Sequence, residues 1–388
     1  MPYGLDFRRG LAPAWSDDGA YYTHIVTDEA ISVIRNHPKD KPMFLYVAHL
    51  APHFATERER LQVPEMYLRD YDDIGHANRT LYAGMVSALD ESVGHVFKAL
   101  HEAGMLEDTV LVFTSDNGAA STSFGLDAAS PWPFKGEKET LWEGGVRVPG
   151  FLWTSKSLWR GPGSIYERFF HVTDWLPTLY EMGGGSVTDL GDIDGVSHLN
   201  SFLSPGTPMP RNEVLININP VENNSAIIQG RYKLVIGNCP HGSNGWIPIP
   251  GDHQDPDGNA ATRALEACRN SMVVRVLRSR GDVNPVCTEP TEPLTTGVAY
   301  SVPAVNCGPR SGERHTPCNS DASPCLFDVL SDPCEYNNIA NEMPEVIDRL
   351  LERLEHYEET ALPPGNQEPD ELANPALHGN VWVPWRDD

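Results

Sequence analysis

The sequence predicts an α/β fold: a mostly parallel sheet flanked by helices, followed by a small C-terminal α+β subdomain with an antiparallel sheet. Two observations support the parallel sheet. Apolar runs at 43–48 and 109–114 are separated by an amphipathic stretch at 80–103, which is the strand–helix–strand order of a crossover connection. Both runs are nearly continuous and end in polar residues, as strands buried on both faces do.

Two helices are predicted in the first region. Residues 22–36 place apolar side chains at helical spacing, and His37-Pro38 ends that helix. Residues 80–103 carry a single apolar stripe, and Gly104 suits the position just beyond the last turn. We interpret this stripe as core packing against the sheet.

Two further elements follow the second apolar run. Residues 146–153 are typical of a strand, and Pro149 within them favours an edge or a bulge. The stretch that begins at His171 predicts a helix with Thr173 as its N-cap.

The composition changes near residue 204, where a Ser/Pro/Gly-rich stretch is typical of a linker. We therefore divide the chain into 1–205 and 206–388. In the second part, 214–218 and 226–236 predict antiparallel strands with a turn at Gln229-Gly230, and 344–357 predicts an amphipathic helix. Residues 238–320 are expected to form a cysteine-rich loop insert.

Composition and charge exclude several classes of function. The 388 residues are 40% hydrophobic and 21% charged, which predicts a folded core. The net charge of −25 argues against nucleic acid or an anionic membrane as a partner, and an anionic substrate needs a local basic pocket. No apolar run approaches the ~18 residues of a membrane span, and the first ten residues contain no signal peptide.

Seven cysteines all lie at or beyond Cys239, in sequence rich in Pro and Gly. This crowding favours disulfides and an oxidising compartment, whereas a structural zinc site lacks its paired Cys-x-x-Cys spacing. Two glycosylation sequons, at Asn78 and Asn223, point the same way. The odd count leaves one thiol unpaired, or paired outside this chain.

Candidate functional residues follow both predicted strands. Asp116-Asn117-Gly118 comes directly after 109–114, and its oxygens suit a hard cation such as Ca²⁺ at the carboxyl end of a strand. Lys135 and Lys138 follow within reach of the same edge, where two lysines suit an anionic substrate. Taken singly, the triplet is more often a turn and the lysines are more often solvated.

The combination of these motifs resembles the sulfatase family, most closely its arylsulfatase B type. Ser-Asp-Asn-Gly at 115–118 is followed by Pro-Phe-Lys-Gly-Glu-Lys-Glu-Thr-Leu-Trp-Glu-Gly-Gly-Val-Arg-Val-Pro at 133–149. An Ala-Pro-His segment that ends at His53 follows the first strand, as in this family. Leu-Phe-Asp with a later Asp-Pro at 326–333 resembles the C-terminal region of sulfatases.

The resemblance implies an alkaline-phosphatase-like fold and Ca²⁺-dependent hydrolysis of sulfate esters, and 1–205 then belongs to the catalytic domain. It implies Asp116 and Asn117 as Ca²⁺ ligands, Lys138 as a sulfate-binding lysine, and His53 as a sulfate-binding or leaving-group residue. No family role is carried onto Lys135. Cys325 and Cys334 flank the Leu-Phe-Asp strand and its turn, so we expect them to pair.

Three family features are absent from these 388 residues. No Cys-x-Pro-x-Arg occurs, the motif from which the family makes its formylglycine nucleophile. The Asp-Asp pair that supplies other metal ligands and the Gly-Lys-Trp-His-type segment are also missing. We therefore expect an N-terminally truncated sulfatase that is inactive alone. A lysosomal or secreted location is expected, with the signal peptide lost along with the missing N-terminus.

Two other interpretations stay open. One is a non-catalytic, sulfatase-like binding protein, and the other is a phosphatase or phosphodiesterase of the same superfamily. The stretch 136–147 favours a sulfatase over the phosphatase. The arylsulfatase B likeness suggests sulfated N-acetylgalactosamine of a glycosaminoglycan as substrate. The oligomeric state and the pairing of the remaining cysteines cannot be predicted.

Overall fold

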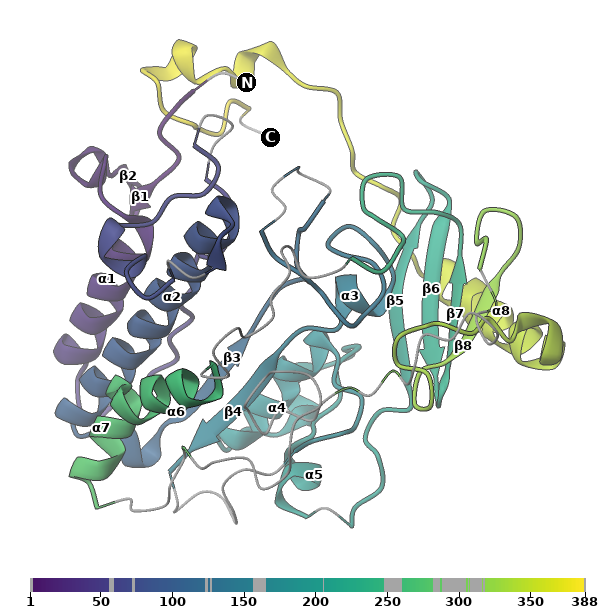
Figure 1. The fold of residues 1–388 in the computed structure, drawn as a ribbon, viewed down its shortest axis with the longest axis horizontal. Coiled ribbons are helices and arrows are strands. Elements are labelled where there is room, and N and C mark those ends of the chain that lie inside the picture. Colours follow the sequence, from purple (N-terminus) through teal and green to yellow (C-terminus); the bar gives the residue numbers. More distant parts are fainter. Residues whose placement is uncertain are drawn as a thin grey trace.

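In the computed structural model of the chain, the residues described are 3–55, 59–71, 74–122, 125, 128–155, 165–204, 206–247, 260–281, 287, 305, 307, 316 and 318–386. Figure 1 shows three groups of elements side by side. Helices α1, α2, α6 and α7 form one side, strands β3 and β4 with helices α3 to α5 lie in the middle, and strands β5 to β8 with helix α8 form the other side.

The helical group is organised around α1 (Tyr22–Asn36) and α2 (Ala77–Glu102). The predicted bounds of α1 are confirmed, and α2 begins three residues earlier than predicted. A buried cluster that includes Ile34 of α1 and Phe97 of α2 joins the two helices. The hydroxyl of Thr27 also donates to the hydroxyl of Ser92 at 2.5 Å inside this contact, so a buried polar pair is satisfied.

Two helices lie where the sequence suggested only loop: α6 (Ala260–Asn270) and α7 (Met272–Ser279). The expectation of a loop across 238–320 is therefore wrong for this part. The side chains of Val273, Val276 and Leu277 follow helical spacing and pack into the cluster formed by α1 and α2. The helical spacing of these apolar residues is visible in the sequence, but the Pro- and Gly-rich sequence around them favoured a loop.

The central strands, β3 (Val110–Thr114) and β4 (Gly150–Thr154), pair antiparallel, with Val110 opposite Thr154. The predicted strand at 146–153 is thus confirmed from Gly150 onward, after Pro149. The run 43–48 is not part of a strand ladder in the described chain, so no parallel pair with 109–114 forms there.

The side chains of the run 43–48 alternate between two environments. Met43 and Leu45 pack on the α1–α2 cluster, whereas Phe44 and Tyr46 are each 81% exposed. A segment with one buried face and one exposed face behaves as a half-buried extended chain. The apolar composition alone could not reveal this difference from a central strand.

Helix α4 (Trp175–Met182) follows a 3₁₀ turn at Val172–Asp174. The N-cap of this unit is His171 rather than the predicted Thr173. The ring of His171 accepts from the Thr173 backbone N–H, while the Asp174 carboxylate accepts from the His171 N–H, which is a reciprocal capping arrangement. Short helices α3 (Glu143–Val146) and α5 (Leu199–Leu203) complete the middle group.

The second sheet has the order β5–β6–β7–β8, all antiparallel, as predicted. Its strands are β5 (Glu213–Asn219), β6 (Asn224–Gln229), β7 (Tyr232–Ile236) and β8 (Cys325–Asp328). Helix α8 (Pro344–Glu358) packs Leu350 and Leu354 on one face of this sheet. The other face buries Phe327 against Leu141 and Trp142, so it supports the loop that carries Lys138.

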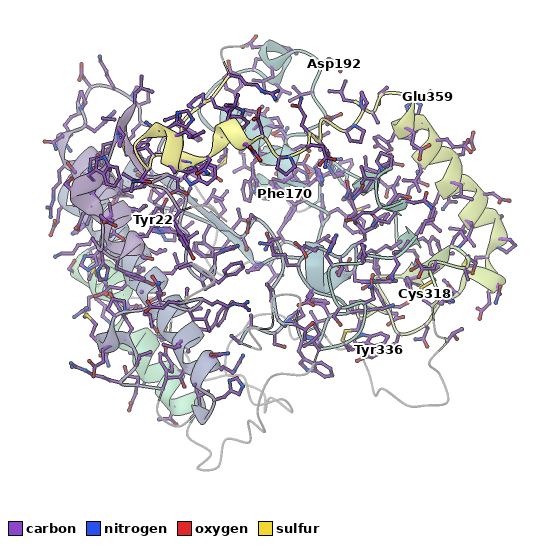
Figure 2. All side chains as sticks on the ribbon, turned by 90° about the horizontal axis from the view of Figure 1, so that it is seen from above. Tyr22, Phe170, Asp192, Cys318, Tyr336 and Glu359 are labelled. Carbon is purple, nitrogen blue, oxygen red and sulfur yellow. A yellow bond between two sulfur atoms is a disulfide. The ribbon has the colours of Figure 1, made fainter. Side chains whose placement is uncertain are left out.

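The first and last described segments of the chain lie close together. Figure 2 shows α1, marked by Tyr22, and the end of α8, marked by Glu359, at opposite sides of the molecule. The tail after α8 crosses back to the N-terminal segment, where Leu5 and Val381 form a parallel bridge.

The remaining elements are β1 (Arg8–Arg9), β2 (Ala12–Pro13) and the 3₁₀ turns Trp15–Asp17, Glu65–Tyr67, Leu106–Asp108, Val187–Leu190, Ala340–Glu342, Glu371–Ala373 and Pro375–His378. No helix in the described part is long and apolar enough to span a membrane.

The cysteines form three disulfides, Cys268–Cys287, Cys307–Cys334 and Cys318–Cys325, and Cys239 is a buried free thiol. The predicted Cys325–Cys334 pair is wrong. The segment that returns alongside β8 contacts it through Ile339, whose N–H donates to the carbonyl of Leu326. Cys334 lies in the turn beyond the strand, where its partner is Cys307.

Candidate active site

The carboxyl end of β3 is held against α3 by close backbone contacts between glycines. The N–H of Gly118 donates to the carbonyl of Gly145 at 2.8 Å. A Cβ added to Gly118 would lie 1.9 Å from the carbonyl oxygen of Gly144, which no side chain can tolerate. The close approach of the two backbones therefore depends on the Asn-Gly after β3 and on the Glu-Gly-Gly of α3 together.

The loop between β3 and α3 places Lys138 beside this strand end. The N–H of Lys138 donates to the carbonyl of Ala119 at 2.8 Å. Gly136, with φ of 80°, provides the turn that precedes it. The backbone of Lys138 thus lies beside the residues that follow β3.

Buried Glu137 fixes the same loop from inside. Its carboxylate accepts hydrogen bonds from the N–H of Ser121 at 2.7 Å, the N–H and hydroxyl of Thr122 at 2.8 and 2.6 Å, and the N–H of Ser243 at 2.8 Å. Burial by itself would raise the pKa of Glu137, but these donors outweigh it and lower the pKa below its ordinary value. Sequence reasoning missed this residue, because one Glu in a charged stretch carries no signal of burial.

Lys138 and His53 are brought together from segments 85 residues apart. The Lys138 Nζ lies 3.3 Å from the His53 Nε2. The His53 Nδ1 lies 2.7 Å from the carbonyl oxygen of Phe54, so Nδ1 carries the proton and Nε2 has the free lone pair in the neutral ring. The contact therefore joins an ammonium donor to an imidazole acceptor, which is a pair that an anion can separate and bind.

Asp116 and Asn117 offer part of a coordination shell. The Asn117 Nδ2 donates to the carbonyl of Gly118 at 2.9 Å, which leaves Oδ1 as the available ligand atom. Within the described ranges the exposed Asp116 carboxylate makes no hydrogen bond or ion pair, and no group of three or more His, Cys, Asp or Glu could hold a metal. The two oxygens fit a hard cation, but they are fewer than the 6–8 ligands that Ca²⁺ takes.

Lys135 does not join Lys138 at the strand end, so the expectation that both lysines lie on one edge is wrong. Lys135 is 5% exposed, and its Nζ lies 3.3 Å from the ring centre of Trp142 and 5.2 Å from that of Trp246. Burial lowers the pKa of Lys135 to about 8. Residue 135 forms an isolated bridge with Trp246, and this pairing turns its side chain into the core.

A buried ion network lies directly beneath the loop. Lys233 of β7 is fully buried, and its Nζ lies 2.9 Å from Glu143 Oε1 and 2.8 Å from Glu335 Oε1. The Glu335 carboxylate also accepts from the N–H of Glu143 at 2.9 Å. Burial raises the pKa of Glu335 to about 7. A lysine inside the apolar run 232–236 was the one sequence signal for this network.

His171 and Asp174, which sequence reasoning placed outside the catalytic set, belong to a second buried network. Asp174 is fully buried and accepts from Arg211 Nε at 2.8 Å, from the N–H of Val196 at 2.9 Å, and from His198 Nε2 at 3.2 Å. This network links α4 to the chain just before β5 and lies outside the His53–Lys138 contact.

The two predicted glycosylation sites lie in different settings. Asn223 is exposed, in the turn between β5 and β6, and its φ is 53°. Asn78 lies in the first turn of α2 and is half-buried. The exposed turn is the more accessible acceptor for a glycan.

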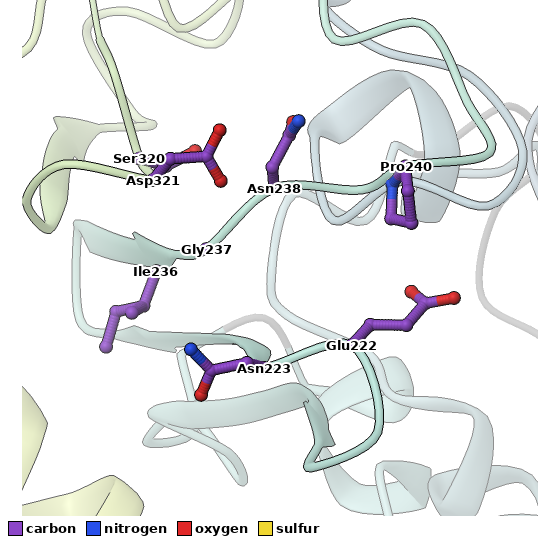
Figure 3. A pocket seen from close by; sticks show the side chains of 8 residues that line it. All are labelled: Glu222, Asn223, Ile236, Gly237, Asn238, Pro240, Ser320 and Asp321. Carbon is purple, nitrogen blue, oxygen red and sulfur yellow. The ribbon is translucent and has the colours of Figure 1, made fainter.

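Two of the cavities that described residues line do not include His53 or Lys138. The smaller, of about 240 Å³, lies between the β5–β6 turn, the end of β7 and residues 320–321 (Figure 3). Glu222 and Asp321 make it acidic, which does not suit an anionic ester.

Replacing Glu137 by Gln is expected to destabilise the fold by about 1–3 kcal/mol at pH 7, because the amide offers one acceptor oxygen to four donors. The pKa of Glu137 is lowered by folding, so its contribution is full above the ordinary carboxyl pKa and is lost as the pH falls. The difference between wild type and variant in urea unfolding should shrink on acidification. Glu139→Gln, at an exposed neighbour, is the control; an equal loss there would contradict this role.

Comparison with known proteins identifies relatives of this chain. The sulfatase family model matches residues 4–185. Arylsulfatase J of Mus musculus is 30% identical over 385 residues, which cover 98% of this chain and 56% of that protein. N-acetylgalactosamine-6-sulfatase of Mus musculus is 30% identical over 218 residues, which cover 55% of this chain and 38% of that enzyme. The chain thus spans about half the length of arylsulfatase J.

A solved structure supports the fold. It comes from a Bacteroides thetaiotaomicron locus for the metabolism of multiple glycosaminoglycans, and it superposes with a TM-score of 0.56 at 20% identity. The superposition covers 90% of this chain and 56% of that one. The fold is alkaline-phosphatase-like, as predicted, with an antiparallel C-terminal sheet. The family match at residues 4–185, the curated relatives and the fold together support this chain as a member of the sulfatase family.

Proposed function

We propose that this chain forms the sulfate-binding part of a Ca²⁺-dependent sulfuric ester hydrolase. One observation carries the proposal: Lys138 Nζ and His53 Nε2 meet at 3.3 Å beside the strand end that presents Asp116 and Asn117. The proposed ligands are a sulfated small molecule or glycosaminoglycan at Lys138 and His53, and Ca²⁺ at Asp116 and Asn117. When bound, Ca²⁺ would polarise the sulfate oxygens.

The chemistry of these side chains fits a sulfate ester. The Lys138 ammonium can donate to a sulfate oxygen and offset the charge that develops there. The His53 Nε2 can take up a proton and pass it to the ester oxygen as that oxygen leaves. The Nδ1 bond to the Phe54 carbonyl keeps the ring oriented for this transfer.

The nucleophile is not among these residues, because the sequence contains no Cys-x-Pro-x-Arg. We therefore propose that the 388 residues bind sulfate esters without hydrolysing them. The absent motif favours, as the second candidate, a non-catalytic sulfatase-like binding protein. A lysosomal or secreted location is proposed, since three disulfides suit an oxidising compartment. Sulfated N-acetylgalactosamine is the proposed substrate, supported by the N-acetylgalactosamine-6-sulfatase likeness.

The test is binding of an aryl sulfate to the purified chain in the presence of Ca²⁺, measured by calorimetry. Lys138→Ala is expected to weaken binding about tenfold or more, because a charge-assisted hydrogen bond contributes ~1.5–3 kcal/mol. Lys98→Ala, at an exposed lysine of α2, is the matched control and should bind like wild type. Equal affinities for all three proteins would overturn the proposed site.

Hydrolysis is measured in the same samples by release of the aryl alcohol. No turnover above background is expected from the 388 residues. Turnover would show that a nucleophile outside the Cys-x-Pro-x-Arg motif is present, and it would contradict the binding-only proposal for this chain.

A further inference from the structure

A second cavity, of about 680 Å³, opens where the β6–β7 turn meets α8. Arg231 lies in that turn, Arg349 is on α8, and Arg168 comes from the segment before α4. Its volume is within the ~300–1,000 Å³ typical of small-molecule sites. None of its lining residues belongs to the candidate site built around Lys138.

The cavity is basic although the chain carries a net charge of −25. Three arginines line it, with Glu167 as the carboxylate among the lining residues. A positive concavity on an acidic protein concentrates anions locally, whereas the rest of the surface repels them. An anion is therefore the ligand that this cavity selects.

Two of the arginines are held in place by contacts within the fold. Arg168 Nη1 donates to the hydroxyl of Ser201 at 2.6 Å and to the carbonyl of Pro208 at 3.1 Å. Arg231 Nη2 pairs with the Asp328 carboxylate at 2.5 Å. Exposed Arg349 makes no hydrogen bond or ion pair with any residue that the structure describes. Its full guanidinium fork is thus available to a ligand.

The other lining groups favour a sugar as the carrier of the anion. Tyr232 offers a ring and Asn212 an amide at the same cavity, and these are the groups that contact sugar rings and hydroxyls. The guanidinium fork matches two oxygens of a sulfate group. We propose that this cavity binds a sulfated oligosaccharide, at a site separate from Lys138. The choice of sulfate among anions rests on the proposed function, whereas the basic cavity does not.

The experiment measures binding of a 4-sulfated chondroitin hexasaccharide to the full chain by calorimetry at physiological salt. The variant is Arg231→Ala/Arg349→Ala, because both side chains are exposed and neither is part of the core. The control, Arg35→Ala/Lys98→Ala, removes two exposed cations from α1 and α2. The cavity variant should bind about tenfold or more weakly, and the control should bind like wild type.

Two further probes separate the outcomes. Unsulfated chondroitin hexasaccharide should bind wild type weakly, and inorganic sulfate should not reproduce the hexasaccharide affinity. Equal binding by the cavity variant and wild type overturns the inference, and so does equal binding of inorganic sulfate. If Lys138→Ala alone loses the hexasaccharide, the proposed function stands and the cavity site fails. If only the cavity variant loses hexasaccharide binding, the cavity site is supported and the proposed function is contradicted.

Discussion

Lys233→Met is expected to lower the free energy of unfolding by about 3–5 kcal/mol, because it leaves the carboxylates of Glu143 and Glu335 buried without their cation. Chemical denaturation at pH 7 measures the change. The loss should exceed that of any single exposed lysine, because two carboxylates lose their partner at once. A change of less than about 1 kcal/mol would contradict a structural role for the network.

Two companion variants separate the charge effect from side-chain packing. Lys98→Met, at a half-exposed lysine of α2, should change stability by no more than about 0.5 kcal/mol. Lys233→Met combined with Glu335→Gln should recover part of the loss, because one uncompensated carboxylate is removed. The network joins β7 to α3. The double variant therefore also tests whether the sheet supports the Lys138 loop through these ion pairs or through side-chain packing.

The second large effect is expected at Asp174. Asp174→Asn leaves Arg211 and buried His198 without a carboxylate and should cost about 3–5 kcal/mol in a denaturation experiment. Asp189→Asn, an exposed change of the same kind, should stay within about 0.5 kcal/mol. Similar losses from the two variants would show that the Asp174 contacts do not stabilise the fold.

The same residue predicts a dependence on pH. Burial alone would raise the pKa of Asp174, but hydrogen bonds from His198, Arg211 and two backbone N–H groups hold it well below its ordinary value. A carboxyl pKa that folding lowers gives stability that is complete above the unfolded pKa and disappears as the pH falls. Wild type should therefore lose stability on acidification faster than Asp174→Asn, and parallel curves would contradict this account.

Local sequence determined several elements well. The helical spacing and the His37-Pro38 stop gave α1 its observed ends, and the apolar run at 110–113 lies within β3. The Lys138 motif and the histidine after the first apolar run predicted two side chains that meet in the structure. These features depend on periodicity, on stop signals and on short motifs, all of which act over a few residues.

Other features depended on which segments meet in space. Lys135 and Lys138 are three residues apart, yet one packs on Trp142 and the other meets His53. Likewise, Cys325 pairs with Cys318, whereas Cys334 pairs with Cys307. Helix α7 was recognised only from the structure, where its apolar face is buried against α2.

The sequence by itself thus determined the family, the helices with clear spacing, and the strand end that carries the candidate ligands. The tertiary structure decided the burial of Lys135 and Lys233, the disulfide pairing, and the gathering of three arginines at one cavity. The physical reason is that burial and charge pairing are properties of neighbours in space. A lysine or cysteine has the same local sequence signal whether it faces solvent or a partner from a distant segment.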